Sequence, residues 1–436
     1  MTHPPLHVLC IEPRFPGRLG PVADWLVRRR GYRCQFYCHS ADPRDRWPPS
    51  VGCGLDVVPF GVGGVARESH AHWTRQLERG LCYAYGCWEV LQARQPRPVD
   101  LVLGRSNGLG STLFVPACLP GVPIVNLLDY FYLPHENDVA GLAGSQTPAE
   151  YFHWRRSANA MDLLDLENGV TPWTITEWQR TLFPVEYRDD IAVQSDGVDT
   201  SRFVDRRDGR PRTVAGRMIP AGWRVVSFVA RCLDRTRGFD RFMELANRLL
   251  RMRSDVLCLV IGGTPVERPF DLEFYQRDYR GHVLGSSPPA DPERLWVLDS
   301  VPHPVVAEAL GISDLHIYPG RPYVVSRSLV EAMAAGCVVL AADTAPVREF
   351  ISHEHTGLLV CADDFDAWAR QACAVLDAPH RFRPLGAAAA GEVRERFGQD
   401  STMPALATLF DQLVAAHAAR SRNVFGRTRI ADAGTG

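Results

Sequence analysis

Lysine is absent from this chain of 436 residues, so all 48 of its basic side chains other than histidine are arginines. The absence excludes a pyridoxal Schiff base, a Walker A phosphate loop and a catalytic lysine, because each of these needs a lysine amine. Any phosphate group must therefore be bound by arginine side chains, backbone N–H groups or hydroxyls.

Other familiar signatures are missing as well. No apolar run reaches the roughly 18 residues of a membrane span, and the first residues lack the basic stretch and apolar core of a signal peptide. The net charge of −2 and the pI of about 6.7 give no overall attraction to nucleic acid. With 46% hydrophobic residues and a mean hydropathy of −0.13, the sequence predicts a soluble, globular, cytoplasmic protein.

Metal-binding patterns are also lacking. The twelve cysteines are scattered without a CxxC pair, and several fall in apolar runs, which favours buried, reduced thiols over a metal site. The one close carboxylate pair of DxD type, Asp364 and Asp366, stands at the start of a predicted helix and is typical of an N-cap with dipole-compensating charge. We therefore expect no essential metal and no cofactor.

The most informative stretch present is a strand-loop-helix-strand pattern. Leu315–Tyr318 and Cys337–Ala342 are short apolar runs that predict buried strands, and good helix formers between them predict a helix over about Ser326–Ala335, ended by Gly336. Such a unit implies a parallel sheet covered by helices. Ligands of parallel sheets bind at the carboxyl ends of the strands, and the free N–H groups and dipole of this helix start favour an anion such as phosphate.

The same alternation of strands and helices occurs in both halves of the chain and predicts two domains. The first half opens with a β-loop-α-β pattern whose loop contains Gly17 and Gly20 but lacks GxGxxG, so it does not indicate a nicotinamide site. These glycines can admit a ligand close to the backbone or form a plain turn. The expected parts are a first domain at 1–204, a linker at 205–222, a second domain at 223–395, a helix at 396–420 that can pack back on the first domain, and a fraying tail at 421–436.

Polar and aromatic residues follow two further strands of the first half. A second glycine-containing loop, Arg105–Thr112, follows the strand Asp100–Gly104, and the run Asp129–Glu136 follows the strand Pro123–Leu128. At the carboxyl end of a parallel strand these residues are candidates for acceptor or sugar contacts. A solvated loop is the competing interpretation of the second run.

Several segments resemble the retaining glycosyltransferase family four. In the second half they are EAMAAGCVVLAADTAPVREFI from Glu331, HTGLLV from His355, FVARCLDRTRGFDRFMEL from Phe228, and LVIGG from Leu259. In the first half, RFPGRLGPVADWL, TITEWQRTLFP and DGVDTSRF resemble a bacterial branch of that family. The resemblance covers most of the chain from residue 7 to about 380. It implies an α/β protein of GT-B architecture, with two Rossmann-like, doubly wound parallel-sheet domains facing a central cleft.

The resemblance assigns roles on the donor side. Glu331 matches the second of two paired glutamates, which holds the ribose hydroxyls, and the first falls on Tyr323 here. Arg231 and Arg237 match the two cations on the donor diphosphate, where guanidinium groups stabilise the charge of the leaving group. Structural alternatives stay open, namely a capping box of Ser328 with Glu331 and ion pairs of the arginines with Asp234 or Glu244.

The remaining expected site residues belong to both halves. Branch relatives place a histidine where Ser106 stands, so that Asp129 and His135 are substitutes to be tested as catalytic residues. The other residues expected at the donor are Gly17, Arg18, Gly263, Val325, Ser326, Arg327 and Ser328, and those expected at the acceptor are Ser106, Asn107, Tyr130 and Glu136.

The function implied by the resemblance is sugar transfer from a nucleotide-diphosphate sugar to a hydroxyl acceptor, with retention of anomeric configuration. The acceptor can be a glycan, a lipid-linked molecule or a small molecule, with peripheral membrane contact an option. The alternatives are a non-catalytic GT-B subunit that binds a nucleotide or a partner, and a nucleotide-sugar epimerase or glycoside phosphorylase.

Overall fold

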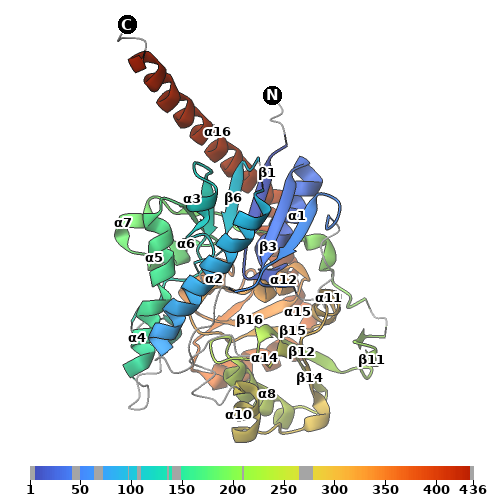
Figure 1. The fold of residues 1–436 in the computed structure, drawn as a ribbon. Coiled ribbons are helices and arrows are strands. Elements are labelled where there is room, and N and C mark those ends of the chain that lie inside the picture. The colour runs from blue at the N-terminus through green and yellow to red at the C-terminus, as the bar shows by residue number, and fades with distance from the viewer. Residues whose placement is uncertain are drawn as a thin grey trace. The chain divides into compact units, whose positions relative to one another are not determined.

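The computed structural model describes most of the chain, as two compact units (Figure 1). The described residues are 5–41, 50–62, 72–96, 98–105, 110–134, 137–139, 149–208, 211–264 and 278–432. The first unit comprises Met1–Pro134, Pro148–Asp196 and Thr402–Gly436, and the second comprises His135–Thr147 and Gly197–Ser401.

The first unit contains a seven-stranded sheet whose strands are all parallel. In spatial order they are β5 (Leu55–Pro59), β3 (Arg33–Cys38), β1 (His7–Ile11), β6 (Leu101–Gly104), β7 (Ile124–Leu127), β8 (Thr171–Thr174) and β9 (Ala192–Val193). A small ribbon pairs β2 (Arg14–Phe15) with β4 (Ser40–Ala41). The helices are α1 (Leu19–Arg30), α2 (His72–Arg94), α3 (Val115–Cys118), α4 (Ala149–Ala158), α5 (Ala160–Glu167), α6 (Glu177–Leu182), α7 (Val185–Arg188) and most of α16 (Gln399–Asp432).

Helices cover both faces of this sheet. On one face, α1 packs with Met403, Leu406, Ala407 and Phe410 of α16 against the strands. On the other face, α2 and α3 contribute Tyr83, Cys87, Leu91 and Val115. Burial on both faces explains why the sequence of β1 is continuously apolar from Val8 to Ile11 and does not alternate with polar residues.

The second unit contains a six-stranded, all-parallel sheet. Its order is β14 (Leu295–Leu298), β13 (Val256–Gly263), β12 (Arg224–Cys232), β15 (Leu315–Tyr318), β16 (Val338–Ala342) and β17 (Leu358–Val360). A hairpin of β10 (Thr213–Val214) and β11 (Arg217–Met218) precedes it. The helices are α8 (Phe239–Met252), α10 (Tyr279–Ser286), α11 (His303–Gly311), α12 (Arg327–Ala334), α13 (Ala345–Arg348), α14 (Phe365–Asp377) and α15 (Pro379–Glu392).

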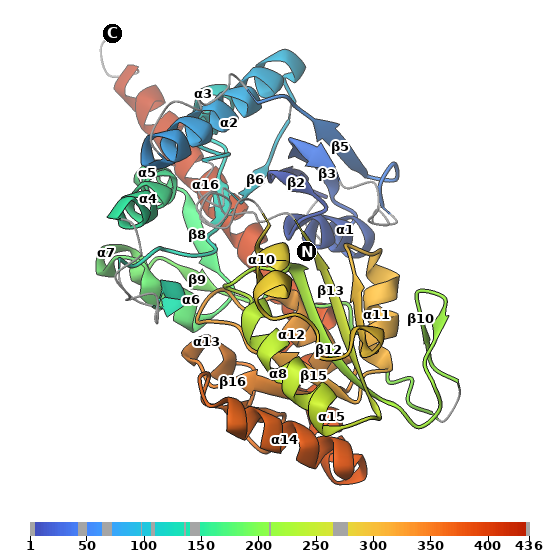
Figure 2. The ribbon, with the colours of Figure 1, turned by 90° about the horizontal axis from the view of Figure 1, so that it is seen from below.

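This sheet is also covered on both faces (Figure 2). The helices α8, α10 and α14 pack on one face, and α11, α12 and Ala389 of α15 pack on the other. The prediction of two doubly wound parallel-sheet domains is therefore confirmed. In each sheet the strand order reverses beside the first strand, at β1/β6 and at β12/β15, and such switch points are where sheets of this kind bind ligands.

One expected boundary differs from the structure. The run 205–222, expected as a linker, belongs to the second unit, where Val214 and Ile219 are buried in the core. The fraying expected of 421–436 stays a prediction, and the backbone of α16 is helical to Asp432.

Candidate functional site

The predicted donor residues of the second unit lie at the ends of β12 and β13, on the loops that follow β12 and β15, and on α12. Arg231 is the last residue but one of β12 and is exposed. Arg237, which is half-buried, donates from Nη1 to the carbonyl of Val324 at 2.8 Å, and its guanidinium carbon lies 5.4 Å from the centre of the Tyr323 ring. The loop after β12 thus holds a guanidinium against the loop that leads into α12.

Backbone contacts join these two loops directly. Gly238 has φ +79°, and a Cβ atom built on it would stand 2.5 Å from the carbonyl oxygen of Pro319. The N–H of Arg321 donates to the carbonyl of Thr236 at 2.9 Å. Only glycine combines this left-handed conformation with so close an approach, so the sequence Arg237-Gly238 is part of what places the arginine.

The side chains of Asp234 and Glu244, the alternative ion-pair partners of Arg237, have other partners in the structure. The carboxylate of Asp234 accepts a hydrogen bond from the backbone N–H of Arg237 at 2.8 Å, and Glu244 pairs with Arg248 at 2.8 Å. The side chain of Arg237 is therefore held by a neutral carbonyl and an aromatic face, which leaves its positive charge available to an anion.

The start of α12 has the form expected of an anion-binding helix end. Ser326 is the N-cap, and its backbone N–H donates to the hydroxyl of Tyr318 at 3.0 Å. Its side-chain oxygen lies 2.5 Å from the Ser328 hydroxyl, and among the described residues it caps no helix N–H. Because the helix begins at Arg327, Ser328 is its second residue, and the capping box of Ser328 with Glu331 is wrong.

Glu331 is instead paired with a residue that the sequence did not single out. Its carboxylate, 8% exposed, lies 2.9 Å from Nε2 of His303, the first residue of α11. The ring of the buried Phe203 meets the imidazole edge-on at 5.5 Å. Burial lowers the pKa of His303, but the hydrogen bond and charge of Glu331 outweigh it and raise the pKa above its ordinary value. The signal in the sequence that could have pointed to His303 is a histidine shortly after one strand and at the start of the next helix.

Three other predicted donor residues lie on the same elements. Arg327 opens α12, and its charge acts on His303. Val325 is buried in the core against the sheet. Gly263 ends β13 beside Cys232 of β12. The structure thus brings Arg237, Tyr323 and the α12 start together, with Glu331 one turn along that helix.

In the first unit, Gly17 and Arg18 have a different environment from the one expected. The carboxylate of Glu12, 1% exposed, accepts hydrogen bonds from the N–H groups of Arg18 and Leu19 at 2.9 Å and 2.8 Å. A Cβ atom on Gly17 would stand 2.3 Å from that carboxylate. An internal side chain therefore occupies the N–H groups at the α1 start, and the expectation that Gly17 and Arg18 contact the donor stays a prediction.

Glu12 is one end of a buried charge network. Arg105 pairs with Glu12 and, at 2.7 Å, with Asp129, while Arg18 pairs with Asp196 at 3.0 Å. Burial acts to lower the pKa of Arg105, but the charges of Asp129 and Glu12 raise it. The network lies at the carboxyl ends of β1, β6 and β7, where the sequence placed both Arg105 and Asp129, but the pairing of Arg105 with two carboxylates was not predicted.

The remaining predicted residues of the first half fall into two groups. Tyr130 is buried and meets Tyr132 edge-on at 4.9 Å, so its ring is part of an aromatic cluster. Ser106, Asn107, His135 and Glu136 lie outside the described residues.

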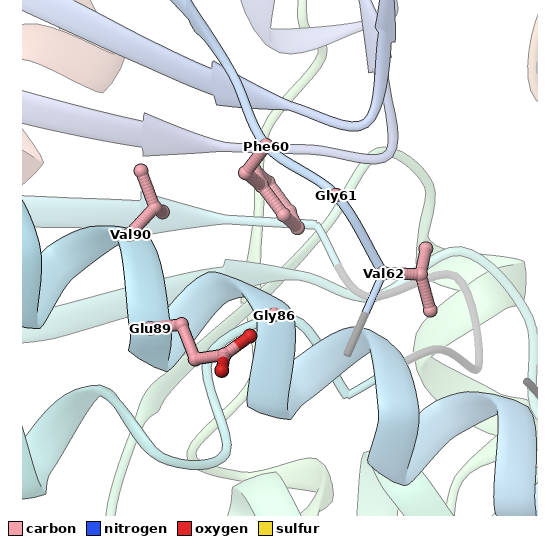
Figure 3. A pocket seen from close by; sticks show the side chains of 6 residues that line it. All are labelled: Phe60, Gly61, Val62, Gly86, Glu89 and Val90. Atoms are coloured by element: carbon pink, nitrogen blue, oxygen red, sulfur yellow. The ribbon is translucent and has the colours of Figure 1, made fainter. Parts of the chain in front are cut away.

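A small hollow of about 310 Å³ lies elsewhere in the first unit (Figure 3). Phe60, Gly61 and Val62, which follow β5, form one side, and Gly86, Glu89 and Val90 of α2 form the other. None of these six residues is among the predicted site residues, so the hollow adds nothing to the donor or acceptor assignments.

The described ranges also bear on metal and membrane binding. The oxygen of Asp364 accepts from the N–H of Ala367 at 2.8 Å, which confirms the N-cap at the start of α14. Within the described ranges, no group of three or more His, Cys, Asp or Glu side chains is placed to hold a metal ion. In the part of the chain that the structure covers, no helix combines the length and the apolar character needed to cross a membrane.

Two family models match consecutive parts of the chain. Residues 30–203 match the model described as "Glycosyl transferase family 4 group", and residues 224–378 match the model described as "Glycosyl transferases group 1". A relative named D-inositol 3-phosphate glycosyltransferase, from Thermobispora bispora, is 26% identical over 262 residues, which span 57% of each chain. The alignment thus spans little more than half the length of that relative.

Solved structures of low sequence identity share the fold. Sucrose-phosphate synthase from Thermosynechococcus elongatus is similar with a TM-score of 0.68 and 16% identity, over 94% of this chain and 100% of that one. HepE from Anabaena, solved in complex with UDP and glucose, gives a TM-score of 0.66 and 15% identity, over 93% and 100%.

Proposed function

Because residues 30–203 and 224–378 match a glycosyl transferase family 4 group model and a glycosyl transferases group 1 model, we propose that this chain is a glycosyltransferase. It moves a sugar from a nucleotide-diphosphate sugar to a hydroxyl acceptor, with retention of anomeric configuration and without a metal ion. The second unit binds the donor, and the acceptor binds to the first.

One observation carries this proposal most directly. Arg237 is fixed by its hydrogen bond to Val324 beside the start of α12, at the switch point between β12 and β15. A guanidinium and a helix N-terminus then act on the same anion, which suits a donor diphosphate. Arg231, exposed at the end of β12, is the second cation of this site.

The chemistry follows from the charge that develops as the donor breaks down. Departure of the nucleoside diphosphate places negative charge on its β-phosphate, which Arg231, Arg237 and the α12 dipole stabilise. By resemblance to the family, the acceptor hydroxyl attacks on the face that the diphosphate leaves, and a phosphate oxygen takes its proton. Glu331 accepts hydrogen bonds from the ribose hydroxyls.

Ligand binding tests the donor half of the proposal. UDP is the first probe, since HepE was solved with UDP, and GDP, ADP and dTDP complete the panel. A nucleotide at 100 times its Kd stabilises the folded chain by about 2.7 kcal/mol. We expect one of the four to raise the melting temperature, and Arg231→Ala or Arg237→Ala to weaken binding at least tenfold.

Arg251→Ala is a matched control, because this arginine is exposed at the far end of α8. It should bind as the unaltered chain does. A folded chain that none of the four nucleotides stabilises, or arginine variants that bind like the control, would contradict the proposal. Sugar transfer or donor hydrolysis by the unaltered chain then separates an enzyme from a non-catalytic subunit.

A further inference from the structure

The pairing of His303 with Glu331 joins two helices at the point where the proposed donor ribose lies. The carboxylate is almost fully buried, whereas the imidazole is 39% exposed. A buried carboxylate needs partners for its lone pairs, and here a histidine from a neighbouring helix supplies one. Because the contact engages one oxygen of Glu331, the other remains for hydroxyl ligands.

The position of His303 is itself held in place. The residue opens α11 directly after Pro302, so the backbone there has the restricted conformation of a helix start. Phe203, 3% exposed, meets the ring edge-on and belongs to the core of the second unit. The imidazole thus packs against a core aromatic ring while its Nε2 lies 2.9 Å from the carboxylate.

Among the described residues, one carboxylate and two guanidiniums act on the charge of His303. Glu331 and Arg327 face it from α12, and Arg202 faces it from the short helix Thr200–Arg202. On α11 itself, the carboxylate of Glu308 accepts hydrogen bonds from the Thr213 hydroxyl and the N–H of Ala215. The immediate surroundings are thus one carboxylate and two guanidiniums, which a bound polyanion would complement.

We propose that His303 is a positioning residue that fixes the Glu331 carboxylate for the donor ribose and makes nucleotide binding depend on its own protonation. The proposal rests on the function proposed above. When His303 is protonated, both ring nitrogens carry a hydrogen, so Nε2 always donates to Glu331. A neutral imidazole can shift its proton to Nδ1, and Nε2 then faces the carboxylate as a second acceptor.

Linkage fixes the direction of the effect. The α12 start lies about one helical turn, roughly 5 Å, from Glu331. A diphosphate bound there favours the charged form of His303, so nucleotide binding takes up a proton. By reciprocity, raising the pH through the titration of His303 weakens nucleotide binding.

The test compares UDP binding between pH 6.0 and 8.5 by the unaltered full chain and by two variants. The unaltered chain should bind UDP about tenfold more weakly at pH 8.5, which corresponds to one unit of pKa change on binding. His303→Gln keeps a donor for Glu331 but does not titrate, so its affinity should stay flat. His303→Ala should bind more weakly than His303→Gln at every pH.

The matched control is His380→Gln, at an exposed histidine of α15, which should keep the unaltered pH profile. Titration of UDP itself is common to all variants and cancels in the comparison. Parallel profiles for the unaltered chain and His303→Gln would overturn the role of His303 while leaving the proposed function intact. A folded chain that binds none of the four nucleotides at any pH would overturn both.

Discussion

Two histidines of the second unit show how the surroundings of one side chain decide its charge. His303 lies beside the Glu331 carboxylate, which raises its pKa against the effect of burial. His316, fully buried on β15, has its Nδ1 3.0 Å from the Ser227 hydroxyl, and its Nε2 has no hydrogen-bond partner among the described residues. Burial lowers the pKa of His316 to about 3. One ring therefore favours its charge, and the other resists it.

His316 should make the second unit sensitive to acid. Its folded pKa of about 3 lies below the unfolded value near 6.5, so the unfolded chain binds the extra proton between these limits. Its contribution to stability is complete above pH 6.5 and is lost as the pH falls toward 3, at up to about 1.4 kcal/mol per pH unit. Urea unfolding of the unaltered chain and of His316→Asn at pH 7.0, 5.5 and 4.5 measures this slope.

The dependence of the unfolding free energy on pH should be weaker for His316→Asn than for the unaltered chain, by up to about 1.4 kcal/mol per pH unit. Carboxylates also titrate in this range, so the difference between the two chains is the informative quantity. His355→Gln, at an exposed histidine, should retain the full slope. Equal slopes for the unaltered chain and His316→Asn would show that His316 is not held neutral by the fold.

Individual side-chain partners were the hardest features to predict from the sequence. Arg237 could be assigned by resemblance, but its bond to Val324 depends on the path of a loop 87 residues away. Glu12 and Arg105 are 93 residues apart, and only the sheet order brings them together. The partner of Glu331 was missed for the same reason, since nothing local in α11 indicates which residue of α12 faces it.

At the scale of elements, strands and their following helices were predicted well. The bounds of β15 agree with the sequence expectation, and those of β6, β7 and β16 differ from it by at most one residue at either end, because each is an apolar run ended by Gly or a polar residue. The hairpin of β10 and β11 and the helix α15 were not predicted. The hairpin strands have two residues each, and α15 contains Pro384, so neither has the pattern of a regular element.

The junction between the loops after β12 and β15 depends on Gly238. An alanine there would have to adopt φ +79° and would place its methyl group 2.5 Å from Pro319 O, a backbone atom that cannot easily move. We expect Gly238→Ala to lower the free energy of unfolding by about 2 to 4 kcal/mol, which combines left-handed strain with overpacking. It should also displace Arg237 and weaken UDP binding at least tenfold.

The variant Gly222→Ala separates left-handed strain from overpacking as the cause of the lost stability. Gly222 has φ +82°, and a Cβ atom there would meet nothing within 4 Å, so only the conformational strain of about 1 to 2 kcal/mol should appear. Its UDP affinity should be unchanged. If both variants lost the same stability and both bound UDP normally, the close contact at Pro319 would have no role in shaping the site.

At the scale of the whole molecule, neither unit is continuous in sequence. The second unit includes His135–Thr147, and the chain passes to it again at residue 197 and returns to the first unit at residue 402. In α16, Met403, Leu406, Ala407 and Phe410 then complete a core that begins at Leu6. From the sequence we expected a helix at 396–420 that can pack back on the first domain, and these four side chains of α16 lie in the core of the first unit.

Phe410 tests whether this returning helix stabilises the first unit. It is fully buried and meets Trp173 of β8 edge-on at 6.3 Å, so Phe410→Ala removes a core side chain and should cost about 3 to 5 kcal/mol. Hydrogen–deuterium exchange should then speed up in peptides of β1 and β8. Peptides of β12 and β15 should keep their protection, because their core contains no residue of α16.

Gln412→Ala, at an exposed position of the same helix, should change stability by less than about 0.5 kcal/mol. Equal loss of protection in both sheets would mean that the two units unfold together, and no loss in β1 would mean that the helix is dispensable to the first core.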